Sequence, residues 1–286
     1  MRCHPISIGI VAGFISGCFI LPVGWSSPLN DTGIDICREH AAGADTSVNP
    51  STSCQPLPTH GAQDARYGRD AAAVKGFLPK VGGSAGTVNG NPNGFDFSKI
   101  SNSGTVLPAS ATLGGGPNDW ACTYDNNTGL MWEVKVNDPT HLRHQNHTYS
   151  WYDSVHNYDG MTGEPSGGTC QTAGRCDTEK FVADVNGVGL CSHTDWRLPT
   201  FKELYTIADR GRTNPAIDPA YFPNTPASFF WSGSPSAEAG LPSALYAKTA
   251  LGVHFLSGAG DAFPRIEVPL IKRVYSMPVR LVRVGK

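Results

Sequence analysis

The apolar positions divide the chain into two unlike parts. Between residues 27 and 117, hydrophobic side chains follow no sustained helical or strand period, and Gly, Pro, Ser, Ala and Asn predominate. Such compositions are typical of turns and loops. Residues 118–286 contain five of the six tryptophans and several short periodic segments. We therefore expect a loop-rich arm over 27–117 and one folded domain over 118–286.

Two helices are predicted in the second part. The first covers about 178–187, where Asp177 or Thr178 provides the N-cap and apolar side chains recur on one face. The second begins after Thr200, because Thr200 and Glu203 form a capping box, and Gly211 is expected to end it. Short strands are expected at 130–134, 229–232, 245–248, 253–256 and 279–284. This order predicts an α+β fold.

An export signal is predicted at the N-terminus. Residues 6–23 are uncharged and follow Arg2, which is the pattern of a signal peptide. Cleavage after Ser26 is favoured, so that residues 1–26 are removed. A lipidated Cys18 is the first alternative, and an uncleaved membrane anchor is the second. In each case the folded part leaves the cytosol and is secreted or held at the cell surface, with periplasm or outer membrane as further locations.

Six cysteines lie outside the signal. An even number of cysteines in an exported chain predicts disulfides. Zinc sites use close pairs such as C-x2-C, which the chain lacks. Proximity favours two pairs and leaves a third, although 15 connectivities stay open: Cys37–Cys54, Cys170–Cys176 and Cys122–Cys191.

The charge balance excludes a nucleic-acid binder that works by bulk charge, because the net charge is −2. Basic residues nevertheless outnumber acidic ones by six to two after residue 250. They are Arg265, Lys272, Arg273, Arg280, Arg283 and Lys286. Either a solvated strand face or a polyanion-binding patch explains this asymmetry. For a glycan ligand, the candidate residues are Lys272, Arg273 and Arg265, with Tyr275, Tyr246 and His254 as stacking partners.

Three other patterns are weaker. Four histidines lie close together in sequence: His141, His144, His147 and His156. Their segment is rich in Asn, Thr and Pro and no acid is interleaved with the first three, so a loop is favoured over a metal site. The G-x-S-x-G string at 82–86 lacks the strand and helix that a nucleophile elbow needs. The acidic string at 184–186 is too short to indicate calcium. No catalytic residue, metal or cofactor is therefore predicted.

Several strings occur together in a fixed order. They are Asp119–Cys122, Asp125–Trp132, Cys191–Leu204, Gly211–Asp218, Phe230–Ser232 and Val279–Arg283. In this order they resemble the family named for the C-terminal domain of the Legionella collagen-like adhesin. The string at 63–70 resembles the lead-in of longer members.

This resemblance implies an exported bacterial surface domain, with an adhesin for sulfated glycosaminoglycans as the named member. The string beginning at Arg197 is also similar to one in formylglycine-generating enzymes, which implies a C-type-lectin-like fold. Their reactive cysteine pair has no counterpart here, so no catalytic residue is carried over. No collagen-like G-X-Y run precedes the domain, so the trimer of the named member is not implied.

Residues of the resembling strings are expected to hold the fold rather than a ligand. Trp196 and Trp231 are predicted core anchors, and Thr200 caps its helix. Arg197 is expected in a buried ion pair between Asp195 and Glu203. Arg280 and Arg283 are expected to tie the last strand to the body.

The sequence thus predicts an exported, disulfide-bonded, non-enzymatic bacterial protein that acts as an adhesin or carbohydrate-binding module. The alternative is a structural or protein-interaction module of a cell-surface assembly. The expected partner is a polyanionic glycan or a cell-surface protein, not nucleic acid. Membrane contact is expected only through the signal anchor or a lipidated Cys18.

Overall fold

The computed structural model describes residues 95–155, 162–236, 249–265 and 274–285, together with the backbone of four short strands nearer the N-terminus. These strands form two antiparallel pairs: β1 (Cys37–Ala41) with β2 (Ala44–Val48), and β3 (Thr87–Val88) with β4 (Asn91–Pro92). The predicted signal and the predicted strand at 245–248 lie outside the described residues.

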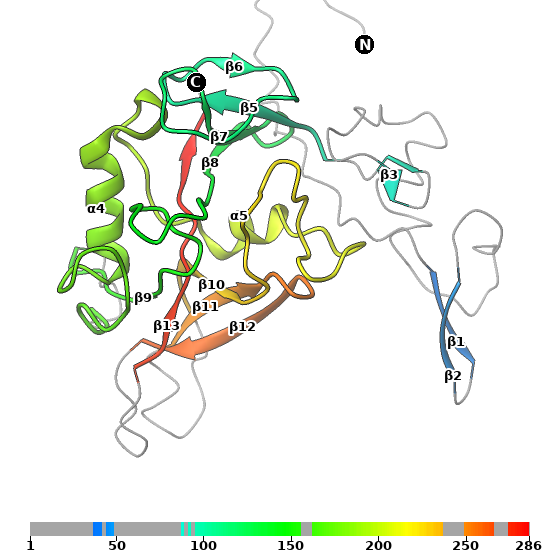
Figure 1. Cartoon of the computed structure of the whole chain (residues 1–286). Coiled ribbons are helices and arrows are strands. Elements are labelled where there is room, and N and C mark those ends of the chain that lie inside the picture. Colours follow the sequence, from blue (N-terminus) through cyan, green and yellow to red (C-terminus); the bar gives the residue numbers. More distant parts are fainter. Residues whose placement is uncertain are drawn as a thin grey trace, which may run out of the picture.

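An antiparallel five-stranded sheet forms one side of the domain (Figure 1). Its order is β14-β8-β7-β5-β6, so the last strand of the chain pairs with a strand formed about 150 residues earlier. The strands are β5 (Phe97–Ser101), β6 (Val106–Leu107), β7 (Trp120–Asp125), β8 (Leu130–Glu133) and β14 (Val282–Val284). The strand predicted at 130–134 is confirmed as β8, and only the end of the one predicted at 279–284 forms β14.

A second antiparallel sheet lies on the opposite side, below α5 in Figure 1. It has the order β10-β11-β12 and contains β10 (Phe229–Pro235), β11 (Thr249–His254) and β12 (Ala259–Pro264). The strand predicted at 229–232 is the beginning of β10, whereas that predicted at 253–256 starts four residues earlier, as β11. A two-stranded ladder joins β9 (Tyr149–Ser150) to β13 (Ser276–Met277).

Both predicted helices form where their caps indicated. Asp177 caps α4 (Thr178–Val188) by accepting a hydrogen bond from the Lys180 amide, and Gly189 ends it in the left-handed conformation at φ 64°. A short 3-10 turn, η1 (Leu190–Ser192), follows. Thr200 and Glu203 form the predicted capping box of α5 (Phe201–Thr206).

The second helix is shorter than predicted. It ends at Thr206 rather than near Gly211. The reason is long-range: the Asp209 amide donates to the Ala216 carbonyl, while the Asp209 carboxylate accepts from the Gly211 amide. These bonds turn the chain away before the glycine is reached.

The core lies in two clusters on the two faces of the five-stranded sheet. Met131 of β8 points into the cluster under α4, which also contains Phe181 and Val185. Its neighbour Trp132 points into the other cluster, which lies between the five-stranded sheet, α5 and the three-stranded sheet. This alternation is what a strand buried on both faces requires, and the α+β class is confirmed. Within the described residues, no helix is long and apolar enough to cross a membrane.

Candidate functional site

Two predicted disulfides are present. Cys122 of β7 is bonded to Cys191 of η1, which ties the sheet to the segment after α4. Cys170 is bonded to Cys176 and closes a short loop before α4. The predicted partner pair Cys37–Cys54 lies outside the residues whose side chains are described.

The ion pairs around the Trp196 segment differ from the prediction. Arg197 binds Glu203 with two hydrogen bonds of 2.8 and 2.7 Å, but it does not pair with Asp195. Asp195 instead accepts from Arg283 at 2.6 Å. The backbone bridge between Arg197 and Val282 lays the two segments side by side, which brings Arg283 close to Asp195. The Arg197 side chain is also partly exposed rather than buried.

The two tryptophans of these strings are enclosed in the core. Trp196 donates its indole N–H to the Leu190 carbonyl at 3.0 Å, and Trp231 donates to the Tyr149 carbonyl at 2.9 Å. Asn186 of α4 also binds both the amide and the carbonyl of Trp196. These contacts hold the segment before α5 against α4.

Arg280 lies in a buried charge cluster that the sequence did not reveal. The cluster consists of Glu133, Lys135, Arg143 and Arg280, all 6% exposed or less. Lys135 approaches Glu133 to 2.9 Å. Burial lowers the pKa of Lys135 to about 8 and that of Arg280 to about 10, while Glu133 opposes both shifts.

Burial corrects part of the predicted glycan patch. Arg265 is only 2% exposed, and its guanidinium lies 4.7 Å from the centre of the Trp151 ring, so it presents no charge at the surface. Arg280 and Arg283 are also buried. Three of the six basic residues that made the C-terminal region positive are therefore internal. Lys272, Arg273 and Tyr246 lie outside the described residues.

The remaining predicted ligand residues belong to one aromatic surface. The β10–β11 register pairs Phe229 with His254, and their rings stack at 4.2 Å. Phe263 of β12 lies on the same face, 4.6 Å from Phe229, and Tyr275 follows 5.8 Å from Phe263. All four rings are partly exposed. We name Phe229, His254, Phe263 and Tyr275 the aromatic row.

The aromatic row is anchored to the core and bordered by a carboxylate. The centre of the Phe263 ring lies 6.1 Å from that of the buried Trp231. Asp261 lies two residues before Phe263 on the same face of β12 and is exposed. Sequence reasoning found His254 and Tyr275 but missed Phe229 and Phe263, because only the strand register shows which aromatic residues share a face.

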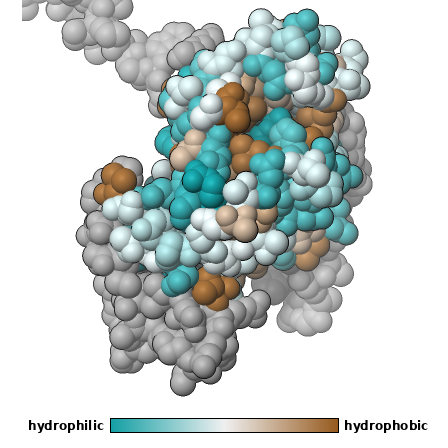
Figure 2. Space-filling model, turned by 60° about the vertical axis from the view of Figure 1, so that its left-hand side comes forward, coloured by the Kyte–Doolittle hydropathy of each residue, from teal (hydrophilic) through white to brown (hydrophobic). Residues whose placement is uncertain are grey.

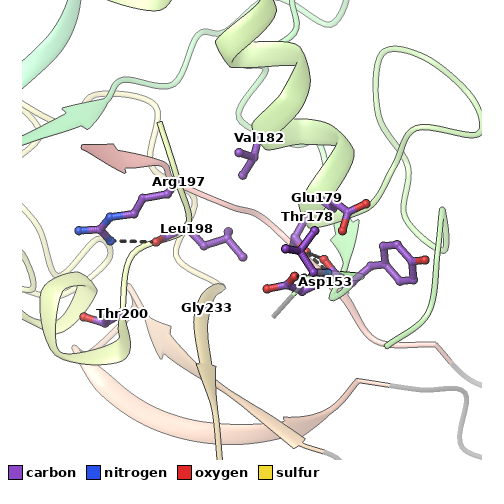
Figure 3. A pocket seen from close by; sticks show the side chains of 10 residues that line it. Asp153, Thr178, Glu179, Val182, Arg197, Leu198, Thr200 and Gly233 are labelled. Atoms are coloured by element: carbon purple, nitrogen blue, oxygen red, sulfur yellow. Dashed lines mark hydrogen bonds between the residues drawn. The ribbon is translucent and has the colours of Figure 1, made fainter. Parts of the chain in front are cut away.

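A pocket of about 490 Å³ opens between α4 and the segment before α5 (Figure 3). Thr178, Glu179 and Val182 line it from α4, and Tyr152, Asp153 and Val155 line it from the loop after β9. Arg197, Leu198 and Thr200 close it from the side of α5, with Gly233 of β10 completing the wall. Its volume falls within the range of small-molecule sites.

Hydrogen bonds hold the first two walls together. The Tyr152 amide donates to the Thr178 hydroxyl, which in turn donates to the Tyr152 carbonyl at 2.7 Å. The Glu179 carboxylate accepts from both the amide and the hydroxyl of Ser154, at 2.6 and 2.7 Å. The loop after β9 is thereby fixed to the first turn of α4.

The third wall depends on a glycine. The Gly233 amide donates to the Pro199 carbonyl at 2.7 Å, which brings β10 against the segment before α5. A Cβ atom at Gly233 would lie 3.1 Å from the Leu198 Cβ, closer than ordinary van der Waals contact. Leu198 and Val182 point into the space between the elements, whereas the Arg197 guanidinium points away from it (Figure 3).

Among the described residues, the surface seen in Figure 2 carries no broad apolar area. Figure 2 shows hydrophobic side chains as separate spots among hydrophilic ones wherever the surface is coloured.

The predicted histidine loop is present. His144 and His147 are mostly buried and lie edge to face at 5.1 Å, and the His141 ring accepts from the Arg143 amide. Among the described residues, no group of three His, Cys, Asp or Glu side chains is placed to hold a metal ion. His156 lies outside them.

The fold and its surfaces define a disulfide-linked α+β domain with an aromatic face and a separate apolar pocket. Residues 121–283 match the model of the Lcl C-terminal domain family, and the chain belongs to that family. The comparison with curated proteins gives no significant match. The comparison with solved structures gives none either, so a C-type-lectin-like form of the fold stays a prediction.

Proposed function

We propose that the chain is an exported, non-catalytic recognition protein of the bacterial surface or its surroundings, and that it binds carbohydrate through the aromatic row. The aromatic row is the observation that carries this proposal. Sugar rings have an apolar C–H face that packs on aromatic side chains, and rings anchored in a core hold their position without a ligand. The membership of the Lcl C-terminal domain family agrees with the adhesin role that the resemblance implied.

The chemistry around the aromatic row suits sugars. His254 and Tyr275 provide polar groups at its two ends, and the exposed Asp261 carboxylate can accept hydrogen bonds from sugar hydroxyls. Phe229 stacks on one face of the His254 ring, and His254 remains partly exposed. Attraction of sulfate is assigned to Lys272 and Arg273, which are adjacent in sequence, whereas Arg265, Arg280 and Arg283 are buried.

The test is binding of the exported chain to a glycan array that includes sulfated glycosaminoglycans, at low and physiological salt. We expect His254→Ala combined with Tyr275→Ala to lower the signal at least fivefold with little change in melting temperature. His193→Ala serves as a control, because His193 is a partly exposed histidine remote in sequence from the aromatic row. An unchanged signal in the double variant contradicts the proposed site.

Further arms of the same experiment separate the alternatives. Lys272→Ala with Arg273→Ala should remove the salt-dependent part of sulfated-glycan binding and leave any binding of neutral sugars. Bound glycans should be recovered with unchanged mass, and cleavage products would contradict the non-catalytic role. A blank array from folded protein would favour a structural or protein-interaction module instead.

A further inference from the structure

The pocket beside α4 contains a carboxylate whose charge is not balanced. Glu179 accepts hydrogen bonds from Ser154 but forms no ion pair within the described residues. The nearby cations are already paired: Lys180 contacts Asp177 at 2.6 Å, and Arg197 binds Glu203 through two bonds. The charge at the pocket is therefore negative, which disfavours an anionic ligand.

The interior of the pocket suits an aliphatic chain. Val182 and Leu198 point into it, and Thr178, Thr200 and Gly233 are among the other residues that line it. The Thr178 hydroxyl is engaged with the Tyr152 backbone, so it offers little to a ligand. A sugar would leave most of its hydroxyl groups unpaired on such a wall.

We propose that this pocket binds a lysine side chain presented by a protein partner. The aliphatic part of the lysine lies between Val182 and Leu198, and its ammonium group reaches the carboxylate of Glu179, which also lines the pocket. Val155 borders the pocket and is 72% exposed, so an apolar residue next to the lysine in the partner has a surface to cover. This site differs from the aromatic row in place and in ligand chemistry.

The matched probes are two capped tripeptides, acetyl-Leu-Lys-Leu-amide and the same peptide with norleucine in place of lysine. Binding to the exported chain is measured by isothermal titration at low salt, together with glucosamine and hexanoate. We expect the lysine peptide to bind at least fivefold more tightly than the norleucine peptide, and hexanoate not to bind. Binding of the lysine peptide should weaken as salt is raised.

Glu179→Gln removes the charge and retains an oxygen that can accept from Ser154. We expect it to reduce lysine-peptide affinity at least fivefold. Asp138→Asn is the matched control, because Asp138 is an exposed carboxylate remote from the pocket lining. Neither variant should alter glycan binding, so this proposal and the proposed carbohydrate site can fail separately.

Four results would overturn the proposal. One is equal affinity for the lysine and norleucine peptides. Another is unchanged affinity in Glu179→Gln when the variant melts as the wild type does. The third is tighter binding of glucosamine than of the lysine peptide, which would assign the pocket to an amino sugar. Failure of all the probes to bind would also refute the proposal.

Discussion

Glu133→Gln should destabilise the protein strongly, because this carboxylate compensates several buried cations at once. Glu133 is fully buried, lies 2.9 Å from the Lys135 ammonium, and raises the pKa of Lys135, Arg143 and Arg280 against the effect of burial. Its second oxygen accepts from the Leu281 amide at 3.2 Å. Glutamine has the same shape and can retain this last bond, so the substitution isolates the charge.

The expected cost follows from the burial of the cluster. Removing one member of a buried ion pair costs about 3–5 kcal/mol, since the other member is left buried without compensation. In a domain of this size that loss lowers the melting temperature by roughly 6–20 °C. Part of the lost free energy of unfolding should be regained above pH 8, because Lys135 can then release its proton inside the folded protein.

Urea unfolding under non-reducing conditions, followed by tryptophan fluorescence, measures this free energy. Glu164→Gln is the control, because Glu164 is partly exposed and its carboxylate makes no hydrogen bond or ion pair with any other described residue. A free energy of unfolding for Glu133→Gln within about 1 kcal/mol of the wild type would refute the reasoning. It would show that the three cations are solvated or neutralised in some other way.

Three further predictions concern the fold. The folded-state pKa of Lys135, about 8, lies below its unfolded value, so the unfolded chain binds more protons above pH 8. The free energy of unfolding should therefore rise by about 2 kcal/mol between pH 7.5 and 9.5. Lys135→Met should remove this rise in urea titrations. Replacing both cysteines of Cys122–Cys191 by alanine should cost about 4 kcal/mol in the same assay, against about 2 kcal/mol for Cys170–Cys176, because the first closes a far longer loop. Arg197→Ala should cost about 1 kcal/mol, since its ion pair is partly exposed; unchanged melting temperature with lost ligand binding would instead assign Arg197 to a ligand site.

Local signals were sufficient to predict the helices. The N-caps of α4 and α5 depend on residues three apart in sequence, and both formed as expected. The end of α5 was predicted wrongly because it depends on Asp209 and Ala216, whose backbone bond is set by tertiary packing. A glycine marks where a helix can end, but a competing long-range hydrogen bond can end it earlier.

Pairing between distant residues could not be predicted from the sequence. Arg197 was expected between Asp195 and Glu203, and of these two it binds Glu203. The strand bridge to Val282 instead brings Arg283 to Asp195 across 88 residues. The pocket could not be predicted for the same reason. Its lining residues run from Tyr152 to Gly233, and their segments meet only in the folded domain.

The charge count at the C-terminus shows why position within the fold matters for function. A sequence count treats every basic residue as a surface charge, although Arg265, Arg280 and Arg283 lie inside and interact with aromatic rings or a carboxylate. For a sulfated polymer, each cation that contacts it releases about one counterion, so the salt dependence of affinity counts the cations at the surface.

Binding through Lys272 and Arg273 should therefore give a slope of log affinity against log salt of about −2, whereas six surface cations would give nearly −6. A measured slope steeper than about −4 would mean that other cations contact the glycan. The buried arginines cannot be those cations. The glycan would then contact cations elsewhere on the surface, and the aromatic row would lie beside the binding site rather than at its centre.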